Sequence, residues 1–171
     1  MKLKLTLIFF ALAALNLAAC GKDKEPAKEP AKVFVSATTS LQITPSPQTP
    51  HTVGKFDPTT STVVAKNGEV GALMFGPYAK LQPGKYEVIY FVTAESDVYG
   101  TEVGTLDVEG YIPPSVDDKL AQAPLKSAPG EQVIKLTFES KNPSYEFQFR
   151  VWTNGKGNRI SIKNINVQKL N

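Results

Sequence analysis

The sequence predicts an all-β protein whose folded part is a single antiparallel β-sandwich. Two observations predict this fold class. The strongest apolar segments alternate with a period of two residues, which is the spacing of side chains on one face of a strand. Proline and glycine, with 13 and 12 residues in a chain of 171, separate these segments at short intervals, as in strands joined by tight turns. Seven or eight short strands are expected, and an up-and-down barrel is the alternative.

The first strands are expected in the segments 33–37, 61–66 and 70–75, which are rich in β-branched and apolar residues. The next segment, 85–93, is apolar on both faces, with Tyr86, Val88, Tyr90 and Val92 opposite Ile89 and Phe91. A run of this kind is typical of a central strand that is covered on both sides.

A further strand is marked by Leu106 and Val108, and it places Asp107 and Glu109 on the outward face. After the N-terminal leader, no window of eleven or more residues shows a convincing helical period of 3.6. At most one helical turn is expected, at 116–122.

The clearest alternation lies in the C-terminal third of the chain. Segment 132–138 places Ile134, Leu136 and Phe138 on one face. In segment 145–151 the apolar face consists of Tyr145, Phe147, Phe149 and Val151. The opposite face carries Glu146, Gln148 and Arg150, and Trp152 continues it. The last strand, 159–168, changes phase, which predicts a β-bulge near Lys163-Asn164.

Residues 1–19 have the layout of a secretory leader, because two lysines precede 15 uncharged residues. A helix of that length spans about 22 Å, less than the roughly 30 Å hydrocarbon core of a bilayer. The leader and the next residue read Leu17-Ala18-Ala19-Cys20 and resemble the lipobox of bacterial lipoproteins. The resemblance implies cleavage before Cys20 and acyl chains, palmitate among them, on that residue. An ordinary signal peptide is the alternative.

Gly21 follows the cysteine, and by resemblance to enterobacterial sorting this implies a protein anchored in the outer membrane, on its periplasmic face or on the cell surface. Residues 20–32 contain Cys20 and a twice-repeated Glu-Pro-Ala-Lys unit, which is typical of a spacer. The β-sandwich domain is expected over 33–171. There 13 Lys and Arg balance 13 Asp and Glu, so no basic surface for nucleic acid is expected.

Two motifs in this domain occur together in a known family. The first runs Phe75-Gly76-Pro77-Tyr78, then Leu81, then Pro83-Gly84-Lys85-Tyr86-Glu87-Val88. The second reads EFQFRVW over 146–152 and continues with Asn154-Gly155. Together they resemble the jelly-roll, galactose-binding-like domains found beside bacterial glycosyltransferases and other glycan-handling enzymes. The resemblance covers roughly 51–169, and it implies a jelly-roll sandwich of the kind found in carbohydrate-binding modules.

The residue inventory argues against an enzyme. Motifs for a nucleophile elbow or a phosphate-binding glycine loop are absent from the sequence. One Cys and one His exclude the ligand clusters that bind zinc. The carboxylate pairs Asp117-Asp118 and Glu95/Asp97 are expected in solvated loops rather than in a glycosidase site. No cofactor is expected; the alternative, without supporting ligand spacing, is a structural Ca²⁺ at Asp97, Asp107, Asp117 or Asp118.

The candidate ligand-binding residues centre on Trp152. This residue shares a strand face with Arg150 and Gln148 and lies just before Asn154. A sugar presents an apolar C–H face and hydroxyl edges, so its binding site needs an aromatic plate with donor and amide groups beside it. The alternative is that Trp152 packs under a loop or against the second sheet while Arg150 forms an ion pair.

Two more residues complete the candidate site. Tyr78 is a second possible plate, and His51 is a possible hydrogen-bonding group, with anchoring of its own loop as the alternative. The sequence thus predicts a non-catalytic envelope lipoprotein that binds a polysaccharide. The other hypothesis is a structural or interaction lipoprotein that docks on an envelope protein complex. An exposed aromatic plate flanked by guanidinium and amide groups would favour the first, and a flat apolar patch the second.

Overall fold

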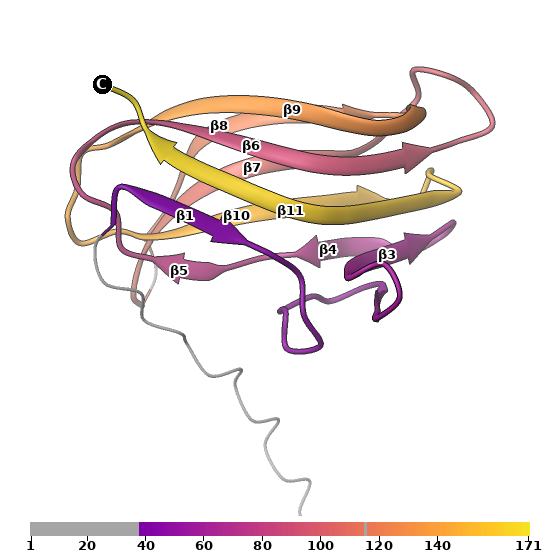
Figure 1. Cartoon of the computed structure of the whole chain (residues 1–171), viewed down its shortest axis with the longest axis horizontal. Coiled ribbons are helices and arrows are strands. Elements are labelled where there is room, and N and C mark those ends of the chain that lie inside the picture. Colours follow the sequence, from indigo (N-terminus) through magenta and orange to yellow (C-terminus); the bar gives the residue numbers. More distant parts are fainter. Residues whose placement is uncertain (1–37, 115) are drawn as a thin grey trace, which may run out of the picture.

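Figure 1 shows two antiparallel β-sheets stacked face to face in the computed structural model of the protein. The structure describes residues 38–114 and 116–171, and every regular element in these ranges is a strand. The predicted all-β sandwich is therefore confirmed. One sheet has six strands: β1 (Ser40–Ile43), β2 (Lys55–Asp57), β3 (Thr62–Lys66), β6 (Gly84–Glu95), β9 (Ala128–Ser140) and β11 (Arg159–Lys169). The other has five: β4 (Val70–Met74), β5 (Pro77–Ala79), β7 (Glu102–Ile112), β8 (Val116–Lys126) and β10 (Glu146–Asn154).

The strand order places β10 inside its sheet. The six-stranded sheet runs β2-β3-β11-β6-β9, with β1 beside the second half of β11. The five-stranded sheet runs β4-β10-β7-β8, with β5 beside the first half of β10. Because β7 flanks β10 on one side and β4 and β5 flank it on the other, the β10 backbone is held along both edges.

The hydrophobic core lies between the two sheets, and aromatic rings join them. Phe147 and Phe149 of β10 are fully buried, and their ring centroids lie 5.6 and 6.1 Å from that of Phe138 on β9. Tyr90 of β6 crosses the core and donates its hydroxyl hydrogen bond to the carbonyl oxygen of Asp107 on β7, at 2.7 Å. The sandwich is therefore closed by packing and by a buried polar contact.

Two details of the sequence prediction are confirmed. The apolar face of β10 (Phe147, Phe149 and Val151) is buried, while Trp152 lies on the opposite face. The pairing of β11 with β6 shifts register between Ile162 and Asn164, at the predicted bulge. The shift lets Ile162 and Ile165 both face the core, although they are three residues apart.

Other expectations are wrong. Residues 116–122 are not a helical turn but the start of β8, an edge strand that pairs only with β7. The described residues contain eleven strands rather than seven or eight, because β1, β2 and β5 are only three or four residues long. The leader 1–19, the spacer 20–32 with Cys20, and the candidate strand 33–37 lie outside the described residues. Within the described residues no helix could span a membrane.

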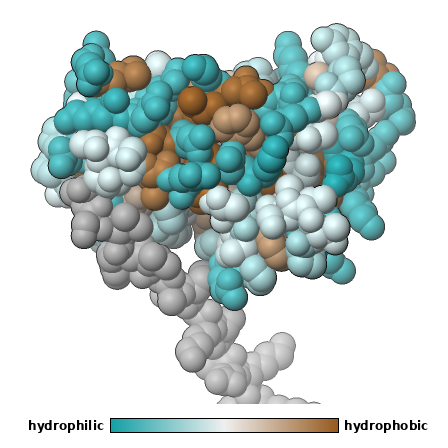
Figure 2. All heavy atoms as spheres, in the orientation of Figure 1, coloured by the Kyte–Doolittle hydropathy of each residue, from teal (hydrophilic) through white to brown (hydrophobic). Residues whose placement is uncertain are grey.

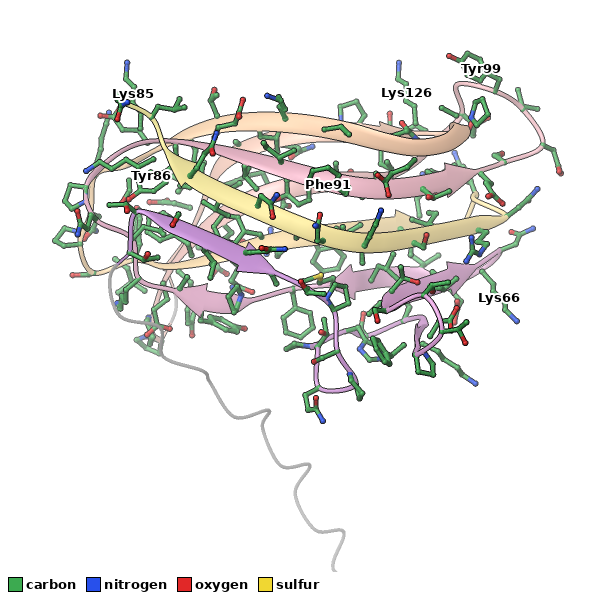
Figure 3. The ribbon with its side chains drawn as sticks, in the orientation of Figure 1. Lys66, Lys85, Tyr86, Phe91, Tyr99 and Lys126 are labelled. Carbon is green, nitrogen blue, oxygen red and sulfur yellow. The ribbon has the colours of Figure 1, made fainter. Side chains whose placement is uncertain are left out.

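The central strand β6 is covered on one side only, which corrects the expectation for 85–93. Its inner residues are buried, but Ile89 and Phe91 on the outer face are only partly so. Figure 3 labels Phe91 on β6. Its cross-strand neighbour, Val133 of β9, is 53% exposed.

Candidate functional site

The outer face of the five-stranded sheet carries a block of polar side chains at its centre. The antiparallel register of β7 and β10 pairs Glu109 with Gln148 and Asp107 with Arg150. Directly paired residues place their side chains on the same face of a sheet. Since the odd-numbered residues of β10 face the core, these four side chains project outward together with Trp152.

Arg150 joins the two acidic residues of β7. Its Nε and Nη2 atoms donate to the two carboxylate oxygens of Asp107 at 2.7 and 2.9 Å, and its Nη1 atom donates to Oε2 of Glu109. Gln148 Nε2 donates to the same glutamate oxygen at 3.2 Å. The side chains of Arg150 and Asp107 are only 14% and 3% exposed. Bidentate geometry of this kind fixes the guanidinium plane, so the network is a rigid floor.

Burial changes the titration of this network. Desolvation raises the pKa of Glu109, and the charge of Arg150 only partly opposes that effect. For Arg150, desolvation lowers the pKa, but the hydrogen bonds and charges of Asp107 and Glu109 outweigh it and leave the pKa raised. The guanidinium is therefore held in its charged state by the two carboxylates beneath it.

A cleft of about 370 Å³ lies over this floor. Trp152 is 37% exposed on one wall, and its ring centroid is 5.5 Å from Cζ of Arg150, within cation–π range. Tyr78 and Tyr111 form another wall, with their rings edge to face and 6.0 Å apart. Phe75, Thr52 and Asp117 also line the cleft. The cleft thus combines aromatic faces with amide, hydroxyl and charged groups.

Tyr78 is held in an unusual backbone conformation. Its φ is +65°, and the preceding Gly76 also has a positive φ of +99°. A bulky residue in the left-handed region is strained, and such strain is concentrated at functional positions. The segment is fastened to β10, because the backbone N–H of Phe149 donates to the carbonyl oxygen of Gly76 at 2.9 Å. The surrounding structure therefore fixes this tyrosine at the cleft wall.

The fold can be compared with solved structures. No protein-family model and no curated protein sequence matches the chain. The carbohydrate-binding module CBM6cm-2 of Cellvibrio mixtus lichenase 5A, solved in complex with cellotriose, is 15% identical over 77% of this chain and 98% of its own, with a TM-score of 0.51. The C-terminal CBM6 of the laminarinase LamC from Zobellia galactanivorans is 14% identical over 76% of this chain and 99% of its own, with a TM-score of 0.49.

The chain shares the jelly-roll β-sandwich fold of such modules. At these identities the likeness concerns the fold, and the expected fold class agrees with it. The assignment of a function has to come from the residues of the site itself.

The structure brings together four of the six predicted ligand-binding residues. Trp152, Arg150, Gln148 and Tyr78 all line the cleft, although Tyr78 is far from the others in sequence. Arg150 forms the ion pairs that the alternative interpretation expected, while Trp152 is 37% exposed on the outer face of β10 and so does not pack between the sheets.

The other two predicted residues do not line the cleft. Asn154 Nδ2 donates to the carbonyl oxygen of Glu102 at 2.8 Å, and its Oδ1 atom accepts from the backbone N–H of Lys156 at 3.0 Å. This asparagine therefore shapes the turn after β10. His51 Nδ1 donates to the carbonyl oxygen of Thr49 at 2.6 Å, within its own loop. Its neighbour Thr52, rather than the histidine, reaches the cleft.

Sequence reasoning missed several lining residues, among them Glu109, Tyr111 and Asp117 as parts of one site. The only available signal was the alternation along β7, which puts Tyr111 on the same face as Glu109. The position of Asp117 depends on β8 pairing with β7, which the expected helical turn excluded. Among the described residues, no group of three His, Cys, Asp or Glu side chains could hold a metal ion.

Proposed function

We propose that this protein binds glycans without catalysis, in the cleft on the outer face of the five-stranded sheet. The observation that carries the proposal is the exposed ring of Trp152 beside the fixed guanidinium of Arg150, in the same cleft as Tyr78. Sugar rings stack their C–H faces on aromatic plates, and their hydroxyl groups bond to nearby amides and charged groups. Likeness in fold to a module solved with cellotriose supports the same assignment.

A non-catalytic role is supported by the state of the carboxylates. A glycosidase needs one carboxyl as acid and a second as base or nucleophile, on either side of the bond that is cut. Both carboxylate oxygens of Asp107 accept hydrogen bonds from Arg150, and Glu109 accepts hydrogen bonds from Arg150 and Gln148. These acids serve to hold the cleft floor.

The first prediction concerns the aromatic ring of Trp152. Replacing Trp152 with alanine should weaken binding of a recognised polysaccharide by about 30-fold or more, the factor equivalent to the roughly 2 kcal/mol of a binding hot spot. The free energy of unfolding should fall by no more than about 1 kcal/mol, because the ring is partly exposed and its strongest fixed contact is with one guanidinium. Glycan-array screening followed by calorimetric titration and a denaturation curve measures both quantities.

A matched control for this experiment is Tyr99→Ala. Tyr99 is 79% exposed and lies in the loop between β6 and β7, outside the lining of the cleft. This variant should bind as the natural protein does. Equal binding by Trp152→Ala would contradict the assignment of the cleft.

The same proposal includes membrane anchoring through Cys20, at the outer membrane, on the periplasmic face or the cell surface. Support comes from the position of the single cysteine directly after Leu17-Ala18-Ala19. Several acyl chains anchor a protein stably, whereas one does not.

The second prediction follows from this anchor. Cys20→Ala should release the protein from the membrane fraction or leave its leader uncleaved, because the thiol that would carry the lipid is gone. Fractionation and intact-mass measurement check the result. A variant that has lost its leader and still sediments with membranes would show that Cys20 is not the anchor.

The second hypothesis, docking on an envelope protein, would use the opposite side of the molecule. Figure 2 shows apolar residues gathered in one area of the visible face. The outer face of the six-stranded sheet carries Ile89, Phe91 and Val133, of which Val133 is 53% exposed. The exposed pairs Lys135–Glu87 and Lys163–Glu131 lie on the same sheet. These charges limit the apolar area, so the glycan-binding cleft is the better-supported site.

A further inference from the structure

The cleft carries more negative than positive charge. Its lining and floor contain the carboxylates of Asp107, Glu109 and Asp117 and one cation, Arg150. Arg150 uses each of its three nitrogen atoms to bond the first two acids. The guanidinium is thus fixed in the floor of the cleft. It cannot turn toward an acidic ligand without breaking its ion pairs with two buried carboxylates.

Asp117 differs from the other two acids. It is exposed on the edge strand β8, paired in register with Tyr111, and it reaches the same cleft. Among the described residues no cation lies within ion-pair distance of it. Its charge acts inside the cleft, because it contributes to the raised pKa of Glu109. The charge of Asp117 therefore remains available to a ligand.

We infer that the cleft selects glycans that contain free amino groups, with Asp117 as the partner of a sugar ammonium, and that it rejects acidic glycans. This inference rests on the proposed function and names its substrate class. A 2-amino-2-deoxy sugar can place its C–H face on Trp152 or Tyr78 while its ammonium faces the carboxylate. A uronic acid would instead bring a third uncompensated negative charge into the cleft.

The test uses the purified full-length protein and short oligosaccharides of matched linkage in three forms: neutral, with free 2-amino groups, and with uronic acid carboxylates. Trp152→Ala reports whether binding takes place in the cleft. Asp117→Asn removes the proposed partner and keeps the size of the side chain. Asp118→Asn is the matched control, because Asp118 is the next residue of the same strand and bonds the hydroxyl of Tyr145 instead.

The expected order of affinity is amino-bearing, then neutral, with acidic oligosaccharides last. Asp117→Asn should weaken binding of the amino-bearing ligand about two- to fivefold more than binding of the neutral ligand, the range of partly exposed ion pairs. Asp118→Asn should change neither. Raising the salt concentration should reduce the preference for the amine, because screening shortens the reach of the charge.

The inference can be overturned either alone or together with the proposed function. Binding of acidic oligosaccharides that is lost in Trp152→Ala, or a preference for amines that Asp117→Asn does not reduce, would refute the charge selectivity and leave glycan binding intact. Absence of any Trp152-dependent binding, in all three forms and across the wider array, would refute the proposed function together with the inference.

Discussion

Replacing Arg150 with alanine should lower the free energy of unfolding by about 3–5 kcal/mol, the cost of breaking a buried ion pair from one side. In this variant Asp107, which is 2% exposed, would lose the partner of both its carboxylate oxygens. Glu109 would lose one of its two hydrogen bonds and keep the one from Gln148. Glycan binding should also be lost, because the floor of the cleft would no longer be fixed. Chemical denaturation followed by tryptophan fluorescence and circular dichroism measures the change.

The control is Lys135→Ala, which removes a cation that is 57% exposed from its pair with Glu87 at 3.2 Å. Exposed pairs of this kind contribute at most about 1 kcal/mol. A loss of stability in Arg150→Ala as small as in Lys135→Ala would mean that the ion pairs of Arg150 with Asp107 and Glu109 do not hold the sheet face together.

Phe149→Ala should also destabilise the domain by about 3–5 kcal/mol, from lost burial and the cavity that remains. Phe149 is fully buried between the sheets, with its ring centroid 6.1 Å from that of Phe138 on the opposite sheet. Its effect should be large without any change in the chemistry of the cleft, since the side chain points away from it. A denaturation curve is sufficient to measure this.

Phe149→Leu is the conservative counterpart, and it should cost less than alanine because more of the volume is kept. Comparison with Trp152→Ala tests the orientation of β10. A stable Phe149→Ala together with a strongly destabilised Trp152→Ala would mean that the two faces of this strand are reversed.

The faces of β10 and the bulge in β11 could be predicted because both depend on a local alternation of apolar and polar residues. In β10 the burial of Phe147, Phe149 and Val151 against solvent-facing Trp152 follows the period of two. In β11 the change of phase between Ile162 and Ile165 has one simple structural solution, an inserted residue. Hydrophobic burial imposes these patterns, so they can be read without knowledge of distant parts of the chain.

The errors arose where the structure depends on long-range pairing. Near its start, strand β8 carries Asp117, Asp118 and Lys119, all exposed, and it has no apolar alternation there because it is an edge strand. Charged residues are common on edges because they discourage pairing with other chains. Asp107 was expected to face outward, and it does, but it is buried because Arg150, 43 residues later, covers it. No local pattern in the sequence predicts the register in which β7 pairs with β10.

The pairing of β10 within its sheet also separates mutations that affect the fold from mutations that affect the cleft. Alternate residues of β10 serve different purposes: Phe149 and Val151 maintain the fold, and Gln148 and Trp152 face the cleft. A mutation at Trp152 can alter the shape offered to a ligand and leave the interior untouched. Arg150 and Gln148 are the exceptions, because they face the cleft and also bond the buried carboxylates of β7. Descendants of this chain could therefore diversify in what they recognise around one fixed charge, with little risk to folding.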